Sequence, residues 1–378
     1  MRKIIILSLF LTVFGFIACE RESGGEPVTG DLVQYPYNPQ PYTIKKPAHY
    51  PEVPVPADNP MTYDGVQLGR HLFYDPILSA DKTMSCASCH FADKSFTDGK
   101  QVSKGIDGIA GTRSSMSLMN IAYVVPTNPA DTFLLFWDGR AKSLESQALL
   151  PVEDPIELHH LWPNVIEDLK NHDKYPQMFR KAFGINDKTE ITKELAAKAI
   201  AQFERIMIGS GTSIYDRYLN GEKDLLQDEV LDGKLMFFDE GGDFGLPDAE
   251  CFHCHGTGTL TGRGFFNNGL DPYDLLQDPG RENVTKNPND RGKFRTTTLM
   301  NIEKTAPYMH DGRFSNLNQV IDHYLFDAIP TPYPNPNLNL IINKKQLYTA
   351  YHRDALVAFL KTLTDNEFIN NPDLQNPF

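Results

Sequence analysis

"LGRHLFYDPILSADKTMSCASCH" (residues 68–90) and "DGKLMFFDEGGDFGLPDAECFHCH" (232–255) are two versions of one pattern in a chain of 378 residues. Both end in Cys-x-x-Cys-His, and three residues ahead of that motif also recur: Gly69, Phe73 and Asp75 match Gly233, Phe237 and Asp239. Two later segments extend the match: "SLMNI" (117–121) with "TLMNI" (298–302), and "FWDGRAKSL" (136–144) with "MHDGRFSNL" (309–317). A repeat of this length indicates a duplicated structural unit.

Cys-x-x-Cys-His is the attachment signature of a c-type haem, in which the thiols bond the porphyrin and the histidine ligates the iron. A zinc site or a chance match is the competing interpretation of one such motif, but two copies inside a repeat argue against both. The sequence therefore predicts two covalently bound haem c groups, with these residues as thioether and axial ligands: Cys86, Cys89 and His90, and Cys251, Cys254 and His255.

Hydrophobic periodicity predicts helices. Residues 192–209 repeat apolar side chains at helical spacing and end at Gly209. Residues 343–363 begin with Asn343 and Gln346, a capping pattern, and contain an apolar face made by Leu356, Phe359, Leu360 and Leu363. No stretch alternates as a substantial sheet would. We predict a mainly α fold of two tandem c-type cytochrome domains related by internal duplication, residues 61–210 and 211–378.

The N-terminal segment has the pattern of an export signal. Arg2 and Lys3 precede an apolar run that ends at Ala18-Cys19, which resembles a bacterial lipoprotein cleavage site. We predict a signal peptide over 1–19, lipidation of Cys19, and a protein anchored by its lipid to a membrane on the periplasmic side. A simple secretory signal and an uncleaved anchor remain alternatives. The nine prolines of residues 20–60 fit either a tether or a strap along the folded body.

Composition narrows the class of protein. Hydrophobic residues make up 40% of the chain and charged residues 22%, as in a soluble globular protein, and the net charge is −13. Nucleic acid is therefore not an expected partner. After Cys19, every cysteine belongs to a Cys-x-x-Cys-His motif, so no disulfide is expected.

Residues 65–365 resemble the bacterial dihaem cytochrome c peroxidase superfamily, in particular its MauG-like branch. The resemblance rests on "LGRHLFYDPILS", "FWDGRAKSLESQALLPVEDPIE" and "TAPYMHDGR" together with the two Cys-x-x-Cys-His motifs. It implies haems near the domain interface, a peroxide site at the N-terminal haem and an electron-transfer haem in the C-terminal domain.

The first haem is expected to have an open face. In the branch that needs reductive activation, a histidine in the loop after the first motif caps this iron. Here that loop, "VSKGIDGIAGTRSS" (102–115), contains no histidine. Met116 is the nearest other soft ligand, but a core role is favoured for it.

The resemblance also implies roles around the open face. Glu157 is the acid–base group, Gln147 orients peroxide or water, and Pro151 shapes the pocket. Sequence alone does not select Glu157 over Glu153 or Asp154. Trp137 lies between the haems as an electron relay, which is compatible with an ordinary core position for a tryptophan.

The second haem distinguishes the branches. Tyr324 lies fourteen residues after His310, where the peroxidase branch has methionine and the MauG branch tyrosine. A phenolate favours iron in its higher oxidation states, whereas methionine favours ferrous iron. The neighbouring His323 is the alternative ligand, and His310 is expected close to this haem.

A calcium site is the remaining implication. Thr305 and Pro307 match its carbonyl positions, but Ser114 stands where the family has asparagine, a better calcium ligand.

The leading hypothesis is a peroxidase that reduces hydrogen peroxide with electrons from a cytochrome c, another redox protein or a protein substrate. The alternatives are a non-catalytic dihaem electron-transfer cytochrome and, less favoured, a haem-based sensor.

Overall fold

The computed structural model describes residues 29–125, 134–256, 258–262, 264–333 and 336–378. The predicted mainly helical character is confirmed, and within these ranges the sheet is a single antiparallel pair of two-residue strands. None of the helices in the described part of the chain is both long enough and apolar enough to cross a membrane. The predicted signal peptide and Cys19 lie outside the described residues.

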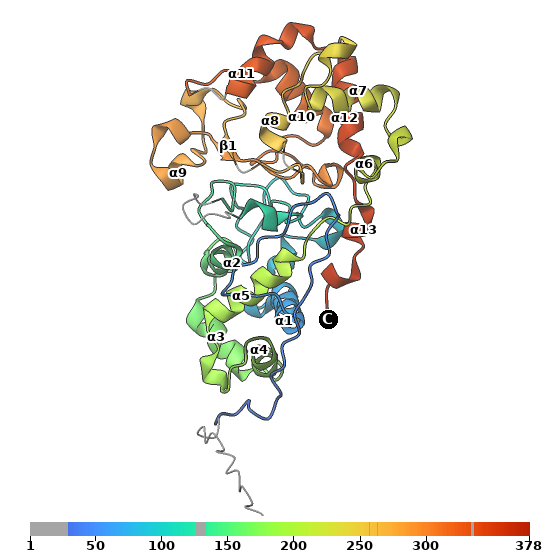
Figure 1. The fold of residues 1–378 in the computed structure, drawn as a ribbon. Helices are drawn as coiled ribbons and strands as arrows, with labels where there is room; N and C mark the ends of the chain where they lie inside the picture. The colour runs from blue at the N-terminus through green and yellow to red at the C-terminus, as the bar shows by residue number, and fades with distance from the viewer. Residues whose placement is uncertain (1–28, 126–133, 257, 263, 334–335) are drawn as a thin grey trace, which may run out of the picture.

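Helices from the N-terminal part of the chain form the lower group in Figure 1: α1 (Tyr63–Tyr74), α2 (Leu144–Glu153), α3 (Trp162–Asn171), α4 (Tyr175–Phe183) and α5 (Lys193–Arg205). Thr62 starts α1 by accepting a hydrogen bond from the Gly65 amide at 3.0 Å. The buried side of α1, including Leu68 and Leu72, packs along α5. This pair is the centre of the lower group.

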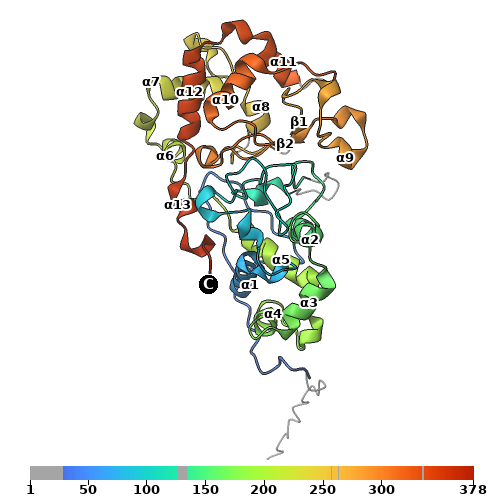
Figure 2. The same cartoon turned by 180° about the vertical axis from the view of Figure 1, so that it is seen from behind.

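Elements from the C-terminal part form the upper group: α6 (Ile214–Leu219), α7 (Asp228–Phe237), α8 (Phe252–His255), β1 (Phe265–Phe266), α9 (Glu282–Thr285), β2 (Phe294–Arg295), α10 (Leu317–Asp322), α11 (Pro336–Asn343) and α12 (Ala350–Lys361). A π-helical segment, His323–Asp327, continues directly from α10. Here α7 packs along α12, as α1 packs along α5. The final helix, α13 (Asn366–Ile369), descends beside the lower group, as Figure 2 shows from behind.

Equivalent residues of the sequence repeat make equivalent contacts. A Cβ atom on Gly69 of α1 would lie 1.9 Å from the carbonyl oxygen of Ala199 in α5. A Cβ atom on Gly233 of α7 would lie 1.9 Å from the carbonyl oxygen of Ala355 in α12. Only glycine lets the helices approach this closely, which explains why glycine occupies both repeat positions.

The "LMNI" elements also match in conformation. Asn120 and Asn301 adopt left-handed backbone with φ values of 60° and 59°, a conformation that asparagine tolerates better than most residues. The Asn120 side-chain oxygen accepts from the Gly209 amide, and that of Asn301 accepts from the Asp365 amide. Each asparagine thus fastens the segment that follows the last helix of its group.

Two helix limits differ from the sequence prediction. Residue Asn343 ends α11 instead of beginning a helix, and α12 begins after Thr349, whose side chain forms a reciprocal cap with His352. The predicted apolar face of α12 is correct, since Leu356, Phe359 and Leu360 are buried. Likewise α5 ends at Arg205, before Gly209.

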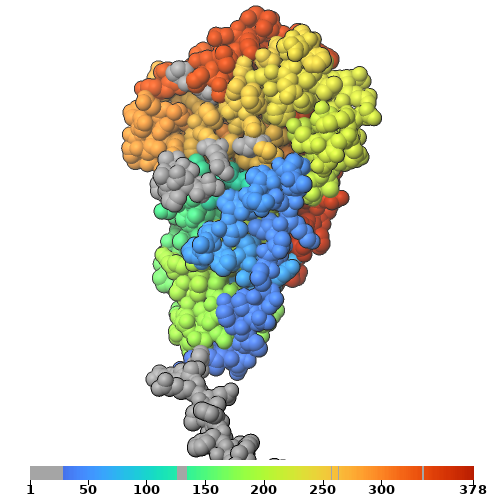
Figure 3. Space-filling view, viewed as in Figure 1, coloured from blue at the N-terminus to red at the C-terminus, as the bar shows by residue number. Residues whose placement is uncertain are grey.

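Residues 29–60 lie against the folded body and reach both groups of helices. Tyr35 O accepts a hydrogen bond from Arg180 on α4, and His49 Nε2 lies 2.9 Å from Asp216 Oδ1 on α6. Figure 3 shows the blue N-terminal part of the chain on this face, from the bottom of the lower group to the upper group.

The C-terminal tail crosses in the opposite direction. After α13 it lies on α1, where the Tyr74 hydroxyl donates to Leu374 O at 2.6 Å and the Arg70 Nε donates to Gln375 O at 2.7 Å. Leu374 is completely buried.

Candidate functional site

Among the described residues, each Cys-x-x-Cys-His motif lines a cavity of its own. The first has a volume of about 500 Å³ and is lined by Cys86, Cys89 and His90. The second has a volume of about 200 Å³ and is lined by Cys251, Cys254 and His255. None of these four cysteines forms a disulfide, so each cavity offers two sulfur atoms and one imidazole to the same occupant.

The two histidines have the chemistry of metal ligands. His90 Nδ1 lies 2.7 Å from the Phe96 carbonyl oxygen, which leaves Nε2 available to a metal. Burial lowers the pKa of His90 and lowers that of His255 to about 4, so both rings are neutral at pH 7. Neutral imidazole is the form that binds a metal. A haem c therefore fits the donor set of each cavity.

The first cavity brings together the residues predicted to act on peroxide. Gln147 and Pro151 line it from α2, and Glu157 lines it from the turn after that helix. Of the competing carboxylates, Glu153 is exposed, and Asp154 Oδ1 accepts from the Ile156 amide within the turn. Of these three carboxylates, only Glu157 combines a place on the cavity wall with a carboxyl group that does not cap the turn.

The environment of Glu157 shifts its protonation. Burial, aided by the charge of Asp154, raises the pKa of Glu157 to about 7, although Arg140 acts in the opposite direction. A carboxyl group with a pKa near the working pH can accept and return a proton.

The loop after the first motif covers the cavity without a histidine. Its lining residues include Ser103, Lys104 and Gly105. Ile106 N donates to Glu157 O at 3.1 Å, and a Cβ on Gly105 would lie 2.1 Å from Ile156 O. Glycine therefore allows the loop to rest on the turn that carries Glu157.

Met116 also lines the first cavity, but its sulfur has another partner. Arg295 Nη2 lies 3.5 Å from Met116 Sδ, within hydrogen-bonding distance for sulfur. This contact connects Met116 to Arg295 of β2, and the core role of Met116 stays a prediction.

Trp137 lies between the cavities, and it lines both. Its Nε1 donates to Ser114 O at 2.9 Å. Its ring meets Phe294 and His310 edge-on, each with ring centroids 6.5 Å apart. His310 in turn stacks on Phe294 at 3.7 Å and lines the second cavity. An aromatic path therefore runs from the first cavity into the second.

Tyr324 and His323 have different surroundings, although they are neighbours in sequence. Tyr324 lines the second cavity, whereas His323 Nε2 is 2.9 Å from Asn268 O, and His323 is absent from the cavity wall. Both lie in the π-helical segment, a distortion that often marks functional sites. Burial raises the pKa of Tyr324 to about 12, and a hydrogen bond with the Asn268 side chain opposes this shift.

The residues of the expected calcium site have contacts within the protein. The Ser114 hydroxyl donates to Met309 O at 2.9 Å, and its carbonyl accepts from Trp137. The Thr305 hydroxyl donates to Ile302 O, and Pro307 lies two residues before Met309. Calcium binding stays a prediction.

The sequence and the fold agree with known proteins. A family model described as di-haem cytochrome c peroxidase matches residues 63–224. Cytochrome c551 peroxidase of Nitrosomonas europaea is 32% identical over 335 residues, which cover 87% of each chain. The chain belongs to the di-haem cytochrome c peroxidase family. Membership makes it an oxidoreductase of the cytochrome c peroxidase type and implies two c-type haems.

Within the di-haem cytochrome c peroxidase family, MauG proteins are also similar. Methylamine utilization protein MauG of Methylorubrum extorquens is 30% identical over 341 residues, covering 90% of this chain and 89% of that protein. The crystal structure of a MauG-like protein associated with microbial copper homeostasis matches with 33% identity and a TM-score of 0.76, covering 89% of this chain and 99% of that one. The dihaem peroxidase BthA of Burkholderia thailandensis, at 21% identity and a TM-score of 0.65, shares the fold.

Three polar residues of the cavity walls, Arg295, Glu204 and Asn268, were not singled out from the sequence of this di-haem peroxidase family member. Arg295 lines both cavities, Glu204 lines the first, and Asn268 lines the second. Glu204 is buried with Oε2 unpartnered, and burial raises its pKa to about 8. Glu204 could have been noticed in the sequence, because it is a charged residue on an otherwise apolar face of its helix. No local sequence pattern marks Arg295 or Asn268.

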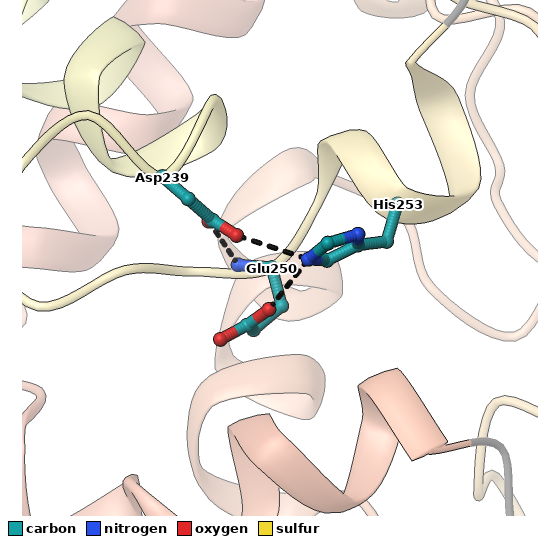
Figure 4. Close-up of side chains that lie close together, drawn as sticks. All are labelled: Asp239, Glu250 and His253. Carbon is teal, nitrogen blue, oxygen red and sulfur yellow. Dashed lines mark hydrogen bonds and ion pairs between the residues drawn. The ribbon is translucent and has the colours of Figure 1, made fainter.

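A cluster of ion pairs holds the second motif in place (Figure 4). His253, between the two cysteines, has its Nε2 2.9 Å from Glu250 Oε2 and 3.2 Å from Asp239 Oδ2. Lys344 approaches the other Glu250 oxygen at 2.5 Å. Burial and the neighbouring Glu250 raise the pKa of Asp239 to about 6. The cluster ties α8 to the ends of α7 and α11.

Proposed function

We propose that this chain is a dihaem c-type peroxidase of the MauG-like kind, reducing hydrogen peroxide at the first cavity. The observation that carries the proposal is the first cavity itself, whose walls include a Cys-x-x-Cys-His motif, Gln147, Glu157 and a loop without histidine. Haem c, when bound there, supplies an iron that binds peroxide and exchanges electrons.

The protein's own groups have defined roles in this proposal. Cys86 and Cys89 would attach the first haem and His90 would ligate its iron, while Cys251, Cys254 and His255 would serve the second haem in the same way. Tyr324 would be a further ligand of the second iron.

The reaction needs two electrons and two protons for each peroxide, giving two water molecules. Glu157 would move a proton from one peroxide oxygen to the other, and the Gln147 amide would orient the peroxide. Because this transfer only relocates a proton that the peroxide already carries, both protons that the reaction consumes come from solvent. Trp137 carries electrons between the cavities. Among the described lining residues, it is the one aromatic side chain that lines both cavities.

The electron donor is a small cytochrome c, another redox protein, or a residue of a protein substrate. The similarity to MauG and to cytochrome c551 peroxidase supports both kinds of donor. We assign residues 61–210 to the peroxide-reacting domain and 211–378 to the electron-transfer domain. We also infer export to the periplasmic side through the segment ending at Cys19.

The test uses the holoprotein as purified, with both irons oxidised. Optical and electron paramagnetic resonance spectra are recorded before and after one equivalent of hydrogen peroxide, without reductant. We expect a high-spin first haem that reacts at once. If both irons are low-spin and inert until half-reduced, an unidentified residue caps the first iron; inertness even then leaves only an electron carrier.

A matched pair of variants tests the acid–base group. Glu157→Gln should slow the peroxide reaction by about a hundredfold or more. Glu153→Gln, four residues earlier and exposed, should leave the rate unchanged. Equal rates in wild type and Glu157→Gln would exclude Glu157 from proton transfer.

A further inference from the structure

Arg295 is a buried cation without an anion. Its side chain is only 5% exposed, yet no carboxylate of the described residues forms an ion pair with it. Its Nε has no hydrogen-bond partner, and Nη2 reaches only Met116 Sδ, a weak acceptor. A buried guanidinium without compensation is strongly unfavourable.

Two other arginines with little exposure have carboxylate partners. Arg113 contacts Asp138 and Asp278, each at 2.6 Å, and Arg205 contacts Glu145 at 2.5 Å. Arg295 therefore differs in what surrounds it: instead of a carboxylate of the protein, it faces both cavities, whose walls it shares with Trp137. The missing counter-charge is expected inside the cavities.

Backbone hydrogen bonds hold Arg295 at the boundary between the two cavities. Arg295 lies on β2, paired with Phe265 of β1, and its amide donates to Trp137 O at 2.8 Å. The repeat sets Ser114 at the equivalent position of the first half, and the Ser114 amide donates to His310 O at 2.7 Å. The two equivalent positions flank the boundary between the cavities, and only one of them carries a charge.

We propose that the Arg295 guanidinium is a counter-charge shared by the carboxylate groups of the two haems, and that it raises both reduction potentials together. The inference rests on the proposed function, because it requires a haem in each cavity. Haem c carries propionate carboxylates, and the forked donors of arginine suit two such groups at once. A positive charge near the irons favours their reduced, less positive state.

Arg295→Gln removes the charge but leaves the backbone contact with Trp137. Spectroelectrochemical titration should then show the oxidised-to-reduced ratio at fixed potential rising about tenfold at each haem, a fall of about 59 mV in each midpoint. Arg295→Lys, which keeps the charge, should stay near wild type. Arg217→Gln removes an equal charge from an exposed pair with Glu222 and should shift neither midpoint.

Pyridine haemochrome assays and circular dichroism accompany each titration. Fewer than two haems in the wild type would contradict the proposed function itself. With two haems bound, an unchanged potential at either haem in Arg295→Gln overturns the shared role. If Arg295→Gln loses haem, Arg295→Lys decides: two haems at wild-type potentials support the proposal, whereas lowered potentials overturn it.

Discussion

At the scale of single residues, the site depends on which carboxylate faces the first cavity. Three acids lie within five positions of each other, and sequence alone does not separate them. The turn after α2 does so: it exposes Glu153, engages Asp154 in its own hydrogen bonds and presents Glu157 to the cavity. Burial there makes Glu157 a weaker acid.

The raised pKa of Glu157 predicts a pH dependence. With a pKa of about 7, the carboxyl group is protonated below that pH and cannot accept a proton from peroxide. The rate of the peroxide reaction should therefore rise about tenfold from pH 6 to pH 8, measured by stopped-flow absorbance. The small residual rate of Glu157→Gln should lack this dependence. A wild-type rate that is flat over the same range would contradict the role of Glu157 as a base.

The choice between Tyr324 and His323 is also testable. In the proposed site, Tyr324→Met would replace a phenolate ligand by a thioether, which favours ferrous iron. We expect the second haem to become easier to reduce, by more than tenfold in the equilibrium constant, with a changed ferric spectrum. His323 is the neighbouring residue whose ring contacts Asn268 O. His323→Gln should leave the reduction equilibrium and the ferric spectrum of the second haem unchanged. The reverse pattern would assign the ligand to His323.

The sequence could identify the cysteines and histidines because each motif is local. Glu157, Trp137 and Tyr324 were predicted through family resemblance, and the structure brings them to the cavities expected for them. Arg295 could not be found in this way. Its significance comes from the absence of an anion around it, which depends on segments that are distant in sequence.

At the scale of secondary structure, hydrophobic periodicity predicted the helices that the structure has as α5 and α12. It did not give their limits. Asn343 and Gln346 have the residue types of a cap, yet Asn343 completes α11, and a further turn separates it from α12. Capping residues are favoured in many turns, so local composition alone cannot distinguish these cases. The π-helical segment around Tyr324 likewise has no sequence pattern of its own.

The two helix pairs should respond alike to the same substitution. Gly69→Ala and Gly233→Ala each place a Cβ 1.9 Å from a carbonyl oxygen of the facing helix. Each should lower the free energy of unfolding by about 1–3 kcal/mol, because the helices must separate. Denaturant titration of the holoprotein measures it. Gly242→Ala, with no atom within 4 Å of the added Cβ, is the control and should change stability by less than about 0.5 kcal/mol.

At the scale of the whole molecule, the two chain ends bind the groups of helices together. Residues 29–60 run from α4 to α6, while the tail after α13 returns to α1. The sequence left open whether the proline-rich segment is a tether or a strap. The described part lies along the body, because residues such as Leu32 and Tyr50 are buried against it.

The tail contributes to stability through one buried side chain. Leu374→Ala should lower the free energy of unfolding by about 2–5 kcal/mol, because it empties a fully buried site next to α1. Thermal and denaturant unfolding of the holoprotein provide the measurement. Leu275→Ala, the same change at a side chain that is 65% exposed, should have little effect. Similar small effects in both variants would mean that the tail is not part of the cooperative structure.

The crossed hydrogen bonds at the boundary between the cavities also bear on ancestry. Ser114 bonds His310, and its repeat counterpart Arg295 bonds Trp137, the counterpart of His310. A surface whose position i meets j while j meets i is the signature of a two-fold symmetric dimer. The two halves of the repeat therefore meet here about a local two-fold axis, as two copies of one duplicated unit would. Trp137 and His310 are equivalent positions at which the two halves differ beside this axis.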